Sequence, residues 1–103
     1  MKKWMMVAAA GLVMASGMAN VHAGDVEAGK AKYVTCMACH GPAGQGQAIF
    51  PAVAGMDAEE LAAKLTAYRA GEQVGPNTAL MAPHAQALSD EDIANLAAYM
   101  ASL

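Results

Sequence analysis

Apolar positions group into stretches with helical spacing, separated by segments rich in glycine and proline. Val26, Gly29 and Tyr33 are spaced to share one face of a helix that Asp25 can cap. Glycine inside a helix costs roughly 1 kcal/mol relative to alanine, so Gly29 indicates that another backbone packs closely there. We expect a first helix that runs from Asp25 toward Cys36.

Two further helices have clear start signals. Asp57 can cap a helix that ends at Gly71, and Ser89 can cap a helix that runs to the end of the chain. Each carries an apolar stripe on one face. The first stripe is Leu61, Leu65 and Tyr68. The second stripe is Ile93, Leu96, Ala97 and Met100.

The remaining segments read as loops. Residues 40–55 are dense in glycine and proline, which indicates a loop that wraps around something. Residues 72–88 contain Gly75, Pro76 and Pro83 and have no sustained apolar period, so we expect a second loop there. No segment alternates as a strand does. The expected fold class is all-α, with about three main helices and loops in one domain over residues 24–103.

Residues 1–23 have the pattern of an export signal. Lys2 and Lys3 precede an apolar run, and the stretch ends in the small-residue pattern Val21-His22-Ala23. An uncleaved anchor is the alternative, but the apolar run is shorter than the roughly 20 residues of a spanning helix. We expect cleavage after Ala23, a periplasmic location and no stable membrane insertion of the mature chain.

Signal removal makes the chain more acidic. The net charge of -3 includes Lys2 and Lys3, so the mature chain has four basic and nine acidic side chains, or -5. This excludes nucleic-acid binding, which needs a basic surface. The mature chain is also short and poor in aromatic residues, and a domain of this size usually requires a cofactor or another staple.

The most specific motif is Cys36-Met37-Ala38-Cys39-His40. C-x-x-C-H is the pattern of c-type haem attachment, in which both thiols form thioethers with one haem and the adjacent imidazole binds the iron. A thioredoxin-like dithiol would need a βαβ context, and a structural zinc site would need four ligands. A disulfide would close too small a loop to add much stability. We therefore expect one covalent haem c.

The second axial ligand has to be chosen among several methionines. Met56 and Met100 fit packing positions of helices. Met81 lies in the expected loop between Asn77 and Pro83, where an irregular backbone could aim its thioether at the iron. An open site remains an alternative, and ligation by His84 would require a remodelled loop.

The chain resembles small bacterial class I cytochromes c of the c5, c553 or single-domain c4-like kind, through CMACH, FPAVAG, NTALMAP and LSDEDIANLAAYM. The resemblance covers residues 24–103. It implies that the first and last helices cross where Gly29 and Tyr33 meet Leu96 and Tyr99. It also implies that the Pro51 carbonyl accepts a hydrogen bond from His40. The axial methionine would be Met81, with Asn77 nearby.

These expectations define a function. Iron bound by His40 and Met81 has no open position, so we expect a one-electron carrier rather than an enzyme. Its partners would be a cytochrome bc1-type donor and a terminal oxidase or periplasmic reductase as acceptor. Segments 41–46 and 80–85 contain no lysine or arginine, which favours apolar docking. A five-coordinate ligand sensor and a fixed subunit of a redox complex are the alternatives.

Overall fold

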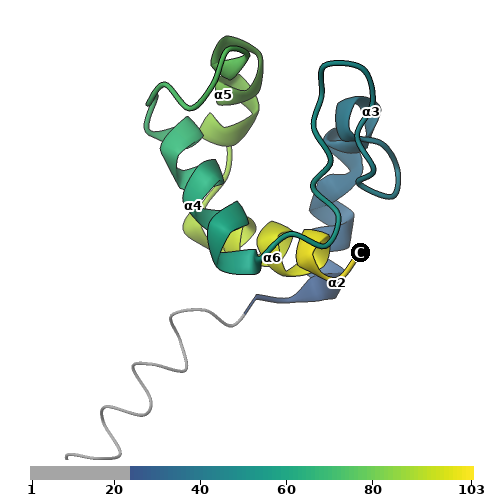
Figure 1. Cartoon of the computed structure of the whole chain (residues 1–103). Helices are drawn as coiled ribbons and strands as arrows, with labels where there is room; N and C mark the ends of the chain where they lie inside the picture. The colour runs from purple at the N-terminus through teal and green to yellow at the C-terminus, as the bar shows by residue number, and fades with distance from the viewer. Residues whose placement is uncertain (1–23) are drawn as a thin grey trace, which may run out of the picture.

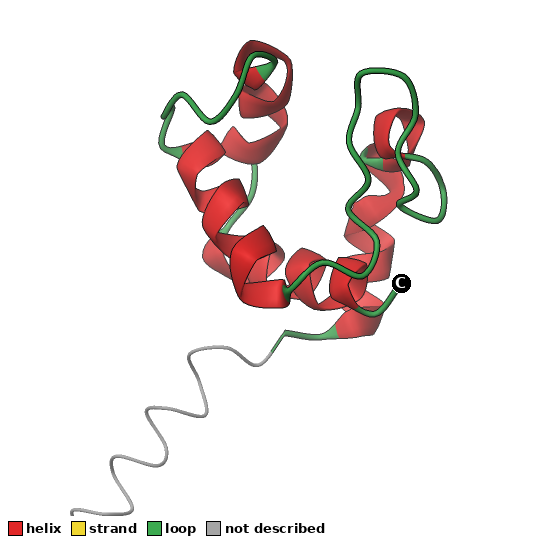
Figure 2. Cartoon of the chain, in the orientation of Figure 1, coloured by secondary structure: helices red, strands yellow, loops and turns green. Residues whose placement is uncertain are grey.

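The computed structural model describes residues 24–103, so the expected signal peptide and its cleavage site lie outside the described residues. The helices are α2 (Val26–Lys32), η1 (Tyr33–Thr35), α3 (Met37–His40), α4 (Ala58–Arg69), α5 (Thr78–Gln86) and α6 (Asp90–Ala101). Within residues 24–103 there is no strand, only an isolated bridge between Gln47 and Phe50 (Figure 2). The all-α expectation is confirmed. None of these helices is long and apolar enough to cross a bilayer.

The helices form two arms joined by α6. In Figure 1, α2 and α3 stand on one side, α4 and α5 stand on the other, and α6 lies between their lower ends. Helix α6 packs against both α2 and α4, and α4 also packs against α5. The last helix therefore sets the spacing between the two arms.

The crossing of α2 and α6 depends on Gly29. A Cβ atom at this position would collide with the Asn95 backbone and lie 2.8 Å from Cβ of Tyr99. The buried Asn95 side chain accepts a hydrogen bond of 2.8 Å from the backbone N–H of Asp25. The rings of Tyr33 and Tyr99 pack with their centroids 5.3 Å apart. The close approach expected at Gly29 is confirmed.

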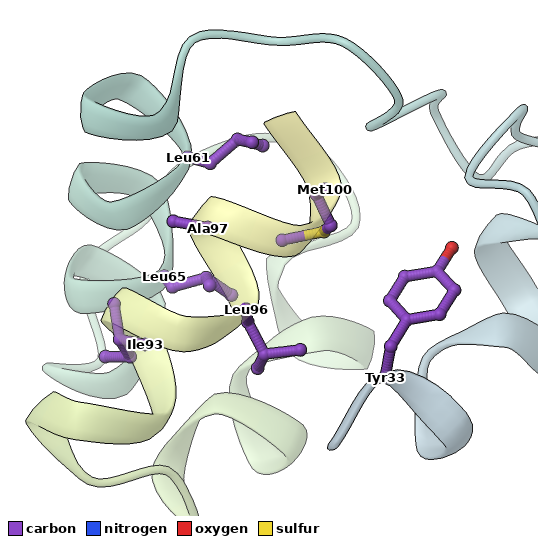
Figure 3. Packing of buried hydrophobic residues seen from close by; sticks show 7 residues of the cluster. All are labelled: Tyr33, Leu61, Leu65, Ile93, Leu96, Ala97 and Met100. Carbon is purple, nitrogen blue, oxygen red and sulfur yellow. The ribbon is translucent and has the colours of Figure 1, made fainter. Parts of the chain in front are cut away.

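The buried core lies along α6. Figure 3 shows Leu61 and Leu65 of α4 facing the apolar side of α6, with Tyr33 approaching from the other arm. Tyr33 and Leu96 are each only 1% exposed. The remaining members of this cluster are Ile93, Ala97 and Met100. The apolar stripe expected for the last helix is therefore its buried face.

Capping residues fix where the helices begin. Asp25 accepts hydrogen bonds from the backbone at Glu27 and Ala28. Ser89 and Asp92 form a reciprocal capping box, with both hydrogen bonds 3.0 Å long. The hydrogen bond from the Ser89 backbone N–H is the main reason that the pKa of Asp92 lies below its ordinary value, and Lys32 contributes at 3.4 Å. The start of α6 is thus set by its own sequence.

The expectation of a loop over residues 72–88 is wrong, because α5 occupies Thr78–Gln86. Pro83 lies inside this helix, although proline removes one helical hydrogen bond. The hydroxyl of Thr78 holds the entry by accepting hydrogen bonds from the backbone at Val74 and Gly75. Ala85 is completely buried, so tertiary packing stabilises a helix that the local sequence disfavours.

Gly29→Ala should destabilise the holoprotein by about 1–3 kcal/mol. Alanine is ordinarily the better helix former, but here its methyl group would push α2 away from the Asn95 backbone. The free energy of unfolding is measured with guanidinium chloride. Gly75→Ala is the control, because no atom lies within 4 Å of the added Cβ. Equal stability of the two variants would contradict the close crossing.

Candidate haem site

A partly open cavity of about 410 Å³ is lined by both arms and α6. Most of the side chains that line it are apolar. One wall is formed by Thr35, Cys36, Cys39, His40 and residues 49–53. Met56, Leu96 and Met100 contribute from the loop before α4 and from α6. The other wall is formed by Leu61, Lys64, Leu65, Tyr68, Val74, Asn77, Leu80, Met81, His84 and Leu88.

The C-x-x-C-H motif forms a single helical turn on the first wall. Cys36 directly precedes α3, and its carbonyl accepts a hydrogen bond of 3.0 Å from the backbone N–H of His40. The thiols of Cys36 and Cys39 are not joined by a disulfide, and both residues are partly buried. Burial raises the pKa of Cys36. The local turn therefore presents both thiols and the imidazole to one cavity.

His40 is oriented by the following loop. Its Nδ1 lies 2.8 Å from the carbonyl oxygen of Pro51. Because a carbonyl can only accept, Nδ1 carries the proton in the neutral imidazole, which leaves the lone pair on Nε2. The ring of Phe50 packs edge-on to the imidazole, with centroids 6.3 Å apart. Pro51 therefore lies where the resemblance implied.

Glycines allow this loop to fold back over α3. Gly46 has a φ of +80° and donates a hydrogen bond of 2.7 Å to the carbonyl of His40. A Cβ on Gly46 would lie 2.6 Å from the backbone nitrogen of Ala52. The side chain of Gln47 donates to the Ala38 carbonyl at 2.8 Å. The loop thus closes on the motif and carries the Pro51 carbonyl to His40.

Tyr33 connects the core to the end of α3, which the sequence reasoning missed. Its buried hydroxyl donates a hydrogen bond of 2.7 Å to the carbonyl of Gly41. Burial is the main cause of the raised pKa of this phenol. The sequence pattern predicts only a helix-packing role for Tyr33, and its place just before the C-x-x-C-H motif is the one signal of a further contact.

Met81 lies on α5 rather than in an irregular loop, and it lines the second wall of the cavity. Asn77 lies at the start of the same helix and also lines the cavity. His84 is exposed at the cavity rim. Met56 and Met100 line the cavity as well, besides packing against the core. The structure thus brings Asn77 and Met81 to the cavity that the C-x-x-C-H motif faces.

These residues fit a covalently held haem. Two thiols and an imidazole with a defined tautomer share one side of an apolar cavity, and a thioether lies on α5 across from them. Such a donor set, with a nitrogen and a sulfur ligand, suits haem iron. The fold and site define a protein of the c-type cytochrome class.

Comparisons with known proteins agree with this class. The family model described as cytochrome c matches residues 26–103. Cytochrome c-554(548) of Halomonas halodenitrificans is 54% identical over 81 residues, which cover 78% of this chain and 98% of that protein. A thiosulfate dehydrogenase electron acceptor of Stutzerimonas stutzeri is 44% identical over 69 residues, which cover 66% of this chain and 32% of that protein.

A similar fold is found among solved structures. Cytochrome c4 of Acidithiobacillus ferrooxidans superposes with a TM-score of 0.70 at 35% sequence identity. The match covers 80% of this chain and 51% of the other, so the chain spans about half the length of that cytochrome c4. This chain belongs to the cytochrome c family and has its small class I fold. Its cofactor is covalently bound haem c, and it belongs among the electron carriers.

Gly46→Ala should destabilise the holoprotein more than Gly71→Ala does. Both residues have positive φ, which costs about 1–2 kcal/mol for a residue with Cβ, but only Gly46 has neighbours that the Cβ would strike. The difference in unfolding free energy should be about 1–3 kcal/mol. The His40 ring N–H should also exchange faster with solvent in Gly46→Ala. Similar stability and exchange in both variants would contradict the role of this loop.

Proposed function

We propose that this chain is a periplasmic one-electron carrier whose haem iron is bound by His40 and Met81. One observation carries the proposal. The C-x-x-C-H turn and Met81 line the same cavity from elements that stand on different sides of the molecule. A planar cofactor between these elements would have one axial position facing each of them.

His40 supplies the first ligand in this proposal. Thioethers at Cys36 and Cys39 would hold the porphyrin edge beside α3, so the adjacent imidazole needs little further ordering. The hydrogen bond from Nδ1 to the Pro51 carbonyl fixes the ring orientation. It also makes the Nε2 lone pair more basic and therefore a stronger ligand for the iron. The fixed tautomer therefore supports His40 as the proximal ligand.

Met81 supplies the second ligand. Its helix, α5, packs against α4, and the hydrogen bonds of Thr78 fix the start of this helix. The thioether therefore comes from an ordered element. Haem supplies one-electron exchange between ferrous and ferric iron when it is bound. A methionine ligand and an apolar surround both disfavour the extra charge of the ferric state and raise the reduction potential. Two filled axial positions support a carrier rather than an enzyme.

The cellular setting is part of the same proposal. Residues 1–23 would direct export and be removed after Ala23. Export would place the two cysteines outside the reducing cytosol, where haem can be attached to them. A cytochrome bc1-type donor and a terminal oxidase or periplasmic reductase would be suitable partners. The relative named as an electron acceptor of thiosulfate dehydrogenase supports transient docking to a redox enzyme.

Met81→Ala should abolish the weak far-red sulfur-to-iron band of the ferric holoprotein. The ferrous variant should then bind carbon monoxide at once, because one axial position is open. Visible spectra of both oxidation states provide the measurement. Met56→Ala is the matched control and should retain the band. If the native ferrous protein already binds carbon monoxide, the five-coordinate sensor becomes the better hypothesis.

The electron-transfer rate should depend weakly on salt. Ile49 is 60% exposed and Leu80 is 53% exposed, and both line the cavity where the haem edge would emerge. Residues 41–46 and 80–85 contribute no lysine or arginine to this region. Between low and physiological ionic strength, the second-order rate with the native partner should change less than about threefold. A fall of tenfold or more would contradict apolar docking.

A further inference from the structure

Lys64 is a charged residue in the lining of a largely apolar cavity. Among the described residues that line it, Lys64 is the only lysine or arginine, and no aspartate or glutamate lines it. Helical spacing places Lys64 between Leu61 and Tyr68 on the cavity face of α4. A single cation thus stands at the edge of a largely apolar cavity.

Lys64 forms only a weak ion pair within its own helix. Its Nζ lies 3.8 Å from Oε2 of Glu60, one turn earlier on the same helix. The two side chains are 49% and 55% exposed, so solvent screens the pair. Lys64 has a long flexible side chain and could exchange this contact for a better one.

Haem brings negative charge that needs such a contact. Its two propionates are carboxylates, and an unpaired carboxylate near an apolar wall is costly. Tyr68 follows Lys64 by one turn and brings a phenolic hydroxyl to the same wall. Among the lining residues, Lys64 is therefore the one lysine or arginine available to the negative edge of the cofactor.

We propose that Lys64 pairs with a haem propionate and acts as a positioning residue that raises the reduction potential. The inference rests on haem occupying this cavity, as the proposed function has it. A cation held near the iron disfavours the more positive ferric state, and the apolar surround strengthens that interaction. The pair also anchors the propionate edge against α4, on the arm that bears no covalent attachment.

The test compares the reduction potentials of four holoproteins by spectroelectrochemistry. Lys64→Gln should lower the ferrous-to-ferric ratio at a fixed ambient potential about tenfold, which equals about 59 mV for a one-electron couple. Lys64→Arg keeps the charge and should stay close to the native value. Lys30→Gln removes the same charge from an exposed position that does not line this cavity, and should have a much smaller effect.

Two results would overturn the proposal. Equal shifts in Lys64→Gln and Lys30→Gln would mean that only the net charge matters. A full shift in Lys64→Arg would assign the effect to packing. Failure of the proposed axial ligation is distinguishable, because the native ferric spectrum reports it separately. The Lys64 comparison stays valid in that case, since haem carries its propionates whatever its axial ligands are.

Discussion

The structure depends on an apolar surface that this chain does not bury by itself. Helix α6 packs against α2 in one arm and α4 in the other. The walls of the two arms face one another across a cavity with a volume of about 410 Å³. Burial of apolar area contributes roughly 25 cal/mol per Å², and a domain of this length has little core to spare. A haem bound in this cavity, as proposed, would therefore be part of the hydrophobic core as well as the redox centre. Stability and electron transfer would then share the same side chains.

The two sides of the site are held by different means. His40 belongs to a turn next to both cysteines, and its imidazole is oriented by a carbonyl only eleven residues away. Met81 depends on α5, and the turn that follows this helix is held by Arg69, which donates to the Leu88 carbonyl at 3.2 Å and pairs with Asp90. The His40 side of the cavity is thus fixed by local hydrogen bonds, whereas the Met81 side depends on tertiary packing. Local opening of the fold should expose the Met81 side first.

What could be predicted from the sequence follows the same division. Caps at Asp57 and Ser89, the turns at glycines and the close approach at Gly29 are local signals, and the structure has them. The Pro51 carbonyl also lies where the family resemblance implied. The caps and the glycine turns need only the propensity of a few adjacent residues, whereas the position of Pro51 followed from the resemblance alone.

Helix α5 could not be found in this way. Gly75 and Pro76 precede it, Pro83 lies inside it and its apolar period is weak, so its sequence does not predict a helix. Its stabilisation comes from the buried Ala85 and from Thr78, which hydrogen-bonds to the preceding turn. The bond from the Tyr33 hydroxyl to Gly41 was missed for a similar reason, since side-chain direction follows from the packing of α2 on α6. The sequence indicated which residue types would line the site, but it did not predict the helix that carries Met81.

The most direct test of the account is proton NMR of the ferrous holoprotein with 13C-labelled methionine methyl groups. Met56, Met81 and Met100 all line the cavity, so each is a candidate for the distal position. The account predicts that the Met81 methyl alone shows the extreme upfield shift of a group directly above the porphyrin. Assignment of that shifted signal to Met56 or Met100, or the absence of such a signal, would contradict it.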